Sequence, residues 1–196
     1  MASAFRRKIR HLVADLTRRL AKLRARLAVA VARRRVPLGY LVGVVALWLA
    51  APMARSLAMG AAIGAIGEAL RMWASGHLEK GREVTSTGPY ALTRHPLYVG
   101  SIIMGVGVAV AAHSVAVAVL VLAYLAITLT AAIRSEEAHL TDKFGGDYPA
   151  YRDGTASPGA RGFSVERAIR NREYRALLGF LAVLLLLAAR RRFAGF

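Results

Sequence analysis

Hydrophobic residues along this chain gather in five runs that polar segments separate. The runs cover residues 36–53, 57–73, 96–112, 114–133 and 176–189. The first four approach or reach the length that a helix needs to cross a bilayer, whereas the fifth holds only about fourteen residues. The pattern predicts an all-α integral membrane protein with a four-helix transmembrane core and a short C-terminal apolar helix.

The first 35 residues show a different pattern, in which hydrophobic positions recur every three or four residues. These positions are Phe5, Ile9, Leu12, Leu16, Leu20, Leu23, Leu27 and Val31. Residues 4–35 also carry twelve Lys and Arg and a single acid, Asp15. The combination is typical of a basic amphipathic helix that lies on anionic membrane lipid. A nucleic-acid-binding arm has a similar composition, but the adjacent apolar runs favour lipid, and we expect no nucleic acid partner.

Small residues and short connections indicate how the membrane helices pack. Gly60, Gly64 and Gly67 give the second run a small-residue face that allows close helix contact. Only His113 and Ser114 join the third and fourth runs, which predicts an antiparallel hairpin. We divide the chain into an N-terminal helix (1–35), a membrane core with a polar lid (36–175) and a C-terminal helix (176–196).

The formal net charge of +17 predicts the orientation of these helices. Lys and Arg gather in the N-terminal arm, the 76–95 loop and residues 134–175, which four spans would place on one side. Short loops rich in Lys and Arg face the cytoplasm, so we expect a bacterial inner-membrane protein whose site faces the cytoplasm. A fifth span would export Arg190–Arg192, and we therefore expect the C-terminal helix to stay at the cytoplasmic interface.

The absence of cysteine excludes disulfides, thiolate metal ligands and a cysteine nucleophile, and no metal site is expected. Unusual polar residues lie instead where the third run begins. Pro96 suits the first turn of a helix, which places Arg94 and His95 just outside a helix N-terminus, where an anion is favoured. Tyr98 lies one step inside the helix, and Gly100 permits close approach to the backbone.

Carboxylates lie at the matching depth of the fourth helix and near the end of the second. Glu137 is three residues from Arg134, so the two can pair on one face while Glu136 points elsewhere, and Glu68 has the same spacing to Arg71. With the aromatic rings and the helix N-terminus, these groups suit a ligand that has a carboxylate, a cation, hydroxyls and a flat base. S-adenosylmethionine has all of these features, and a nucleotide fits nearly as well.

Three segments resemble those of a known family. "GPYALTRHPLYVG" (88–100), followed about 35 residues later by "RSEEAHLTDKFGGDYPAY" (134–151), is similar to the signature of the isoprenylcysteine carboxyl methyltransferase family, whose superfamily includes bacterial phospholipid N-methyltransferases. "RMWASGHLEK" (71–80) resembles a helix end of the bacterial members. The resemblance covers residues 60–152. It implies S-adenosylmethionine as cofactor, bound at the cytosolic face beneath a polar lid, and a lipophilic acceptor that enters from the bilayer.

The resemblance also implies roles for individual residues. Cofactor contacts would be Pro89, Tyr90, His95, Tyr98, Gly100, Glu136, Glu137, Tyr148 and Tyr151. The catalytic residues would be Arg94, His95 and Arg152. An arginine, with Arg71 as a further candidate, would orient a carboxylate acceptor, whereas His95 or Glu136 would take a proton from an amine acceptor. After Tyr151 the chain has "RDGTASPGARGF" where relatives commonly carry a Val-Pro-Arg segment, so the lid contacts and the acceptor stay open.

Two other functions are compatible with parts of this pattern. Sterol reductases, which use NADPH, have a similar architecture and share the Arg-His-Pro motif. They usually follow it with Asn and end in Tyr-x-Gly-Glu, where this chain has Leu97 and Ser101. A non-catalytic membrane adaptor, whose basic arm recruits anionic lipid or partners, would need no cofactor. For the methyltransferase, the acceptor can be a prenylated protein, an isoprenoid-like thiol or acid, or a phospholipid headgroup.

Overall fold

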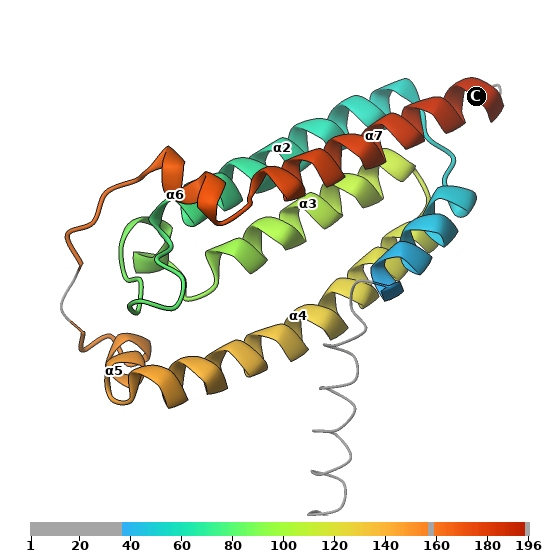
Figure 1. The fold of residues 1–196 in the computed structure, drawn as a ribbon. Helices are drawn as coiled ribbons and strands as arrows, with labels where there is room; N and C mark the ends of the chain where they lie inside the picture. Colours follow the sequence, from blue (N-terminus) through green and yellow to red (C-terminus); the bar gives the residue numbers. More distant parts are fainter. Residues whose placement is uncertain (1–36, 157–158, 195–196) are drawn as a thin grey trace, which may run out of the picture.

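The computed structural model describes residues 37–156 and 159–194, and every regular element in these ranges is a helix (Figure 1). In chain order the elements are a first helix (Pro37–Leu49), α2 (Ala54–His77), the 3-10 helix η1 (Gly88–Ala91), α3 (Pro96–Ala112), α4 (Val115–Phe144), α5 (Asp147–Arg152), α6 (Val165–Arg170) and α7 (Tyr174–Ala194). The prediction of an all-α fold is confirmed for this part of the chain. The basic amphipathic helix predicted for residues 1–35 lies outside the described residues.

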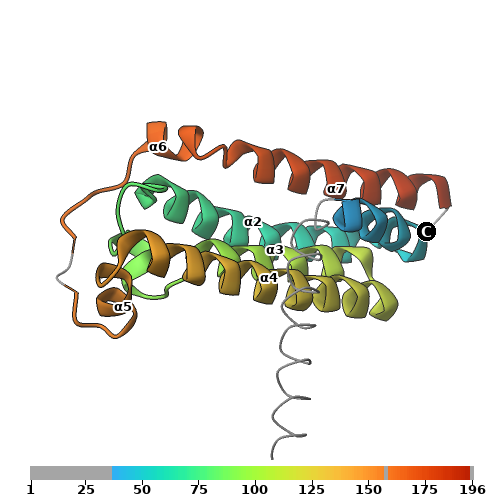
Figure 2. The same cartoon turned by 60° about the horizontal axis from the view of Figure 1, so that its bottom comes forward.

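Helices α2 and α3 form the central pair of the bundle and lie side by side along their lengths (Figures 1 and 2). Glycines allow this close contact. A Cβ atom added at Gly67 would lie 2.6 Å from the Gly100 carbonyl oxygen, and one added at Gly60 would collide with the backbone of Gly107. Gly64 instead faces a ring of α7. The small-residue face predicted from the sequence is therefore present, and α3 and α7 share it.

The connection between α3 and α4 is the tight hairpin that the sequence predicts. Helix α3 ends at Ala112, and His113 takes a left-handed φ of 49°. Ser114 then caps α4 by accepting a hydrogen bond from the Val117 backbone N–H. Two residues are thus enough to reverse the chain.

Helix α4 is longer than its apolar run and carries polar residues out of the apolar part of the bundle. It continues for 30 residues, from Val115 to Phe144, and so includes the carboxylates of the second motif. Among the described residues, it is the one helix that is both long and apolar enough to cross a membrane. The first helix and α3 are shorter apolar helices. The four-helix transmembrane core therefore remains a proposal.

The C-terminal helix differs from the short apolar helix that the sequence predicts. Helix α7 has 21 residues, more than its apolar run of 176–189, and runs beside α2 and α3 toward their far end (Figure 2). Its last residues therefore lie away from the end that holds most of the polar residues, and the expectation that the helix stays at the cytoplasmic interface is wrong for the orientation predicted above. Arg190 gives the physical reason. Its Nε donates to the Ala50 carbonyl at 2.7 Å and its Nη2 to the Trp48 carbonyl at 2.6 Å, at the end of the first helix. The arginine thus holds the last part of α7 against the end of the first helix and satisfies carbonyl groups that a helix end leaves unpaired.

The two ends of the bundle differ in chemistry. At the end where α3 meets α4, small and aliphatic side chains of the first helix, α3, α4 and α7 form a core that includes Ala50, Ala111, Val117 and Leu187. The other end gathers η1, α5, α6, the start of α3 and the end of α4 (Figure 1). Most of the polar residues that the sequence singles out lie at this second end.

Candidate active site

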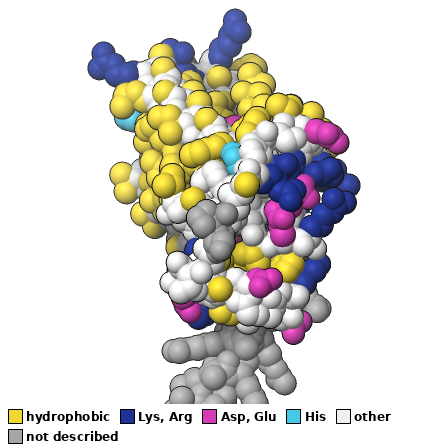
Figure 3. All heavy atoms as spheres, turned by 90° about the vertical axis from the view of Figure 1, so that its left-hand side faces the viewer, with side chains coloured by type: hydrophobic (Ala, Val, Ile, Leu, Met, Phe, Trp, Pro, Cys, Tyr) yellow, Lys and Arg dark blue, Asp and Glu magenta, His cyan; other side chains and the backbone are white. Residues whose placement is uncertain are grey.

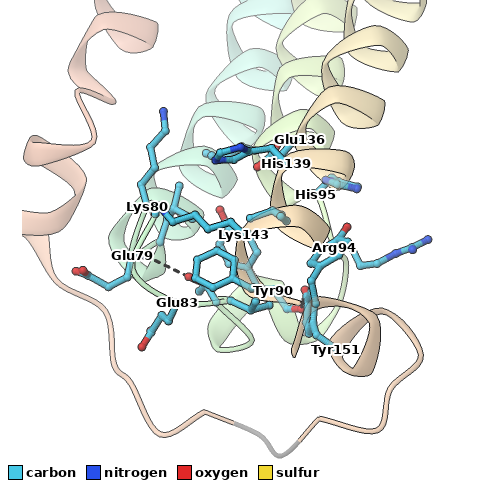
Figure 4. Close-up of a pocket in the computed structure, with 18 of the residues that line it drawn as sticks. Glu79, Lys80, Glu83, Tyr90, Arg94, His95, Glu136, His139, Lys143 and Tyr151 are labelled. Atoms are coloured by element: carbon cyan, nitrogen blue, oxygen red, sulfur yellow. Dashed lines mark hydrogen bonds between the residues drawn. The ribbon is translucent and has the colours of Figure 1, made fainter. Parts of the chain in front are cut away.

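A cavity of about 440 Å³, which we call the polar cavity because of the titratable side chains in its lining, lies where α3 begins and α4 ends (Figure 4). Its walls come from the 78–85 loop, η1, the first turn of α3, the last part of α4 and α5. The polar lining residues are Glu79, Lys80, Glu83, Thr85, Tyr90, Arg94, His95, Tyr98, Ser135, Glu136, His139, Lys143, Tyr148 and Tyr151. A cavity of this volume falls in the range typical of small-molecule sites.

His95 joins the start of α3 to α4. It is the N-cap of α3, and Pro96 takes the first helical position, as the sequence predicts. The His95 Nε2 atom lies 3.1 Å from Glu137 Oε1, and Arg94 Nη1 lies 3.7 Å from the same oxygen. Because an ionised carboxylate only accepts hydrogen bonds, we assign the proton to Nε2, which leaves Nδ1 as the basic nitrogen of the neutral ring.

The partners of the two adjacent glutamates differ from the prediction. The expected pair between Arg134 and Glu137 is replaced by the contacts of Glu137 with the start of α3. Glu136, which was expected to point elsewhere, accepts a hydrogen bond of 2.6 Å from the Tyr98 hydroxyl. The spacing rule considers one helix alone, whereas here a neighbouring helix supplies His95 and Tyr98. Both glutamates therefore tie the two family-like segments together.

One face of α4 forms a complete wall of the cavity. Its members are Ala132, Ser135, Glu136, His139, Leu140, Lys143 and Phe144, which follow the helical spacing of three and four. The Lys143 ammonium reaches the opposite loop, since a Cβ added at Gly81 would lie 3.3 Å from Nζ. His139 and Lys143 were not among the predicted site residues, although they lie three and seven positions after Glu136. Their helical spacing from Glu136 is the signal in the sequence that could have identified them.

Three tyrosines form another wall. The Tyr151 hydroxyl donates to the Tyr90 carbonyl at 2.6 Å, and the rings of Tyr148 and Tyr151 have centroids 6.2 Å apart. Burial raises the pKa of Tyr90 and of Tyr151. Burial and then the negative charge of Glu137 raise the pKa of Tyr148 to about 12. All three side chains are therefore neutral phenols at pH 7, with rings that suit a flat or cationic ligand.

Four predicted site residues do not line the cavity. They are Pro89, Gly100, Glu137 and Arg152. Pro89 is fully buried in η1, and Arg152 is exposed and binds the neighbouring Asp153 at 3.0 Å. Gly100 faces α2, where a Cβ would lie 2.7 Å from the Gly67 carbonyl oxygen. The close approach that Gly100 permits is thus between two helices, and Glu137 reaches the cavity through His95.

Arg71 lies behind the cavity wall and is already engaged. Its Nε is 2.6 Å from Glu173 Oε1 and 4.0 Å from Glu68 Oε2, so the predicted Glu68 contact exists but Glu173 is the closer partner. Its Nη1 donates to the Ser101 hydroxyl. These bonds connect α2, α3 and the residue before α7. Of the three candidate arginines for orienting an acceptor, Arg94 is therefore the one that lines the cavity.

The 78–85 loop supplies a further wall, of which only residues 78–80 belong to a family-like segment. Gly81 has a φ of 75°, and the Thr85 hydroxyl accepts from the Glu79 backbone N–H at 3.2 Å, which closes the loop. The sequence predicts residues 81–85 only as part of a basic loop. Across the described residues, no three His, Asp or Glu side chains are grouped so that they could hold a metal ion.

A second cavity, of about 650 Å³, follows the polar one along α3 and α4. The first helix, α3, α4 and α7 enclose it, mostly with apolar residues such as Leu47, Met104, Val108, Val121, Leu125 and Val183. Along α3, the polar cavity reaches Tyr98 and the apolar cavity starts at Ser101. The structure therefore offers a polar site and an apolar site in line.

Comparison with known proteins identifies the family. Residues 35–147 match the phospholipid methyltransferase family, which confirms the resemblance seen in the sequence. The nickel-cobalt-cadmium resistance protein NccN of Alcaligenes xylosoxydans xylosoxydans is 30% identical over 99 residues, which make up 50% of this chain and 45% of that protein. The chain thus spans about half the length of this relative. No solved structure matches the chain. The family match includes α2, α3, α4 and most of the polar cavity, and this chain belongs to the phospholipid methyltransferase family.

Proposed function

We propose that this protein transfers a methyl group from S-adenosylmethionine to a lipophilic acceptor at the cytoplasmic face of the bacterial inner membrane. The observation that carries the proposal is the polar cavity, which His95, Tyr98 and Glu136 build from the two family-like segments. Membership of a methyltransferase family supports the type of reaction.

The groups of the polar cavity fit the proposed cofactor. Arg94 suits its carboxylate, Glu136 suits its ammonium or hydroxyl groups, and the tyrosine rings suit its flat adenine. When bound, the cofactor supplies a methyl group on a positively charged sulfur. The protein contributes by holding the acceptor in line with that methyl group and by excluding water.

The apolar cavity suits the hydrocarbon part of the acceptor. Tyr98 and Ser101 are about 4.5 Å apart along the axis of α3, whereas on α4 the nearest lining residues, Leu125 and Ala132, are about 10 Å apart. In this proposal an amphiphilic acceptor spans this distance, with its reactive end in the polar cavity. A four-helix core of the first helix, α2, α3 and α4 would hold this arrangement in the membrane. Helix α7 covers the same core. The acceptor would then reach the site from the bilayer.

The role of the catalytic residues depends on the acceptor. A carboxylate arrives ionised, so Arg94 needs only to orient it. An amine must lose a proton, and the proton acceptor in this proposal is Nδ1 of His95, whose Nε2 bonds Glu137. Glu136 is the alternative base, although it already accepts from Tyr98.

The direct test is transfer of a labelled methyl group. Membranes that contain the protein are incubated with methyl-labelled S-adenosylmethionine and extracted with organic solvent. We expect label in the lipid extract, and much less of it with membranes that contain His95→Ala. Lipid analysis of deletion and overproduction strains should then show one species shifted by a methyl group. An unlabelled extract together with NADPH-dependent lipid reduction would support the reductase, and neither activity would support the adaptor.

A further inference from the structure

Glu79 is a buried carboxylate in the wall of the polar cavity, and arginines from a distant segment surround it. The residue is 6% exposed. Arg170 Nη2 donates to Oε1 at 2.8 Å, Arg167 Nε lies 3.0 Å from the same oxygen, and Arg161 Nη1 lies 3.9 Å from it. All three arginines belong to residues 159–173, which we call the strap. Three arginines of the strap thus meet at one acid of the cavity wall, about 80 to 90 residues earlier in the chain.

Further bonds run from the strap to the same wall. The Gly159 backbone N–H donates to the Ser86 hydroxyl at 3.1 Å, and Arg161 Nη2 donates to Glu83 at 2.9 Å. Arg167 Nη1 also donates to the Gly76 carbonyl at 2.6 Å. Figure 3 views this end of the molecule and shows Lys and Arg side chains gathered beside Asp and Glu on one side of it. The strap therefore holds the loop at several points, with Glu79 as the most buried.

Because Glu79 is buried and charged, its contacts with the strap arginines determine the position of the 78–85 loop. A buried carboxylate is stable only with close, hydrogen-bonded partners, and removal of one partner is strongly destabilising. The backbone N–H of Glu79 also bonds Thr85, so a shift of this residue moves the turn that closes the loop. Lys80 and Glu83 line the cavity from the same turn. Arg167 and Arg170 are not among the lining residues.

We propose that Glu79 is a positioning residue: through it, the arginines of the strap fix the 78–85 wall and so set the affinity of the polar cavity for its ligand. The strap includes part of the segment in which the chain departs from the usual family sequence after Tyr151. From this segment, Gly159 and Arg161 contact the loop, while Arg167 and Arg170 follow it in the chain. The ligand itself is that of the proposed function, on which the affinity measurement below rests.

Two variants and a matched control test the proposal. Glu79→Gln removes the charge of the acid, and Arg167→Gln removes its least exposed arginine, which does not line the cavity. Glu166→Gln, next to Arg167 on α6, is the control, because that side chain is 88% exposed and lies 3.9 Å from the Arg170 guanidinium. Each full-length protein in detergent is examined by amide hydrogen exchange and by titration with S-adenosylhomocysteine.

We expect exchange to become faster in residues 78–86 and in the strap together, in both variants and not in Glu166→Gln. Affinity for S-adenosylhomocysteine should fall about tenfold in both variants, a size typical of coupling between separate sites. In the transfer reaction, Arg167→Gln, which lies outside the cavity, should raise KM for the cofactor with kcat nearly unchanged, because the reacting groups remain in place.

Slow, parent-like exchange of residues 78–86 in Arg167→Gln would overturn the proposal. A loss of affinity in Glu79→Gln alone would also overturn it, since it would mean that Glu79 contacts the ligand directly. If Glu79→Gln does not fold, Arg170→Gln replaces it: this change removes one half-exposed partner, and unchanged exchange of the loop would again contradict the strap. If the parent binds no S-adenosylhomocysteine, the proposed function fails, while the exchange comparison still decides the role of the strap.

Discussion

His95 and Glu137 are the residue pair that joins the two family-like segments, across 42 positions of sequence. We predict that His95→Ala and Glu137→Ala each weaken binding of S-adenosylhomocysteine and leave most of the protein folded. A hydrogen bond to a charged group contributes about 1.5–3 kcal/mol, which corresponds to about one to two decades in affinity. Titration calorimetry and thermal unfolding on the same samples measure the two effects separately.

Asp142→Ala is the matched control for this prediction. Asp142 is an exposed acid on the same helix and does not line the cavity, so its removal should leave affinity unchanged. Parent-like affinity in both His95→Ala and Glu137→Ala would mean that the contact between them is an interfacial anchor and not part of a binding site.

Arg71 and its two carboxylate neighbours allow a prediction about stability. Glu173 is buried and lies 2.6 Å from Arg71 Nε, whereas both oxygens of Glu68 are buried and have no hydrogen-bond partner among the described residues. Glu173→Gln should therefore destabilise the protein by about 3 kcal/mol, because it breaks a buried ion pair. Glu68→Gln should cost much less. Thermal unfolding compares the two, and a larger cost for Glu68→Gln would contradict the assigned partners.

Single residues show what the sequence can and cannot predict about the site. The sequence predicts that the motif around His95 lies near the two glutamates, because the start of the third run and the end of the fourth lie at the same depth of the bundle. Their partners could not, since a helical spacing rule pairs Glu137 with Arg134 and cannot see His95. Glu79 lies in the family-like segment 71–80, but the sequence does not indicate its partners, because these arginines lie about 80 to 90 residues away.

At the level of elements, the contact between α2 and α3 depends on glycines. Gly100→Ala should destabilise the protein by about 1–3 kcal/mol, the usual cost of an extra methyl group in a tightly packed site. The physical reason is the 2.7 Å separation between a Cβ at this position and the Gly67 carbonyl oxygen. Thermal unfolding in detergent measures the change.

Gly179→Ala is the matched control for the helix contact. Gly179 lies inside α7 and a Cβ there meets nothing within 4 Å, so alanine should be neutral or stabilising by up to about 1 kcal/mol. If Gly100→Ala is as stable as Gly179→Ala and loses cofactor affinity instead, Gly100 contacts the cofactor, as the family resemblance implies.

The elements themselves followed the apolar pattern closely where apolar residues alone define the helix. Residues 96–112 form α3 as predicted, because Pro96 begins the helix and the hairpin at His113 ends it. Helix α7 is longer than its apolar run predicts. Arg190 is charged and lies outside that run, yet carbonyl groups of the first helix hold it. Tertiary contacts of this kind are invisible to a hydrophobic pattern.

At the scale of the whole molecule, the proposed orientation places the polar cavity in the cytoplasm and the turn between α3 and α4 outside. The chain has no cysteine, so a single introduced thiol reports on its own position. Val115→Cys, 82% exposed at the start of α4, should react with a membrane-impermeant thiol reagent in intact cells. Glu166→Cys should react only after the cells are permeabilised. The opposite labelling would reverse the orientation and separate the site from its cytoplasmic cofactor.

The central claim is that the polar cavity binds S-adenosylmethionine, and calorimetric titration of the purified protein in detergent tests it most directly. We predict saturable binding of S-adenosylhomocysteine, weakened by Glu137→Ala, and no binding of NADPH. Binding of NADPH alone, or of neither compound by folded protein, would contradict the claim.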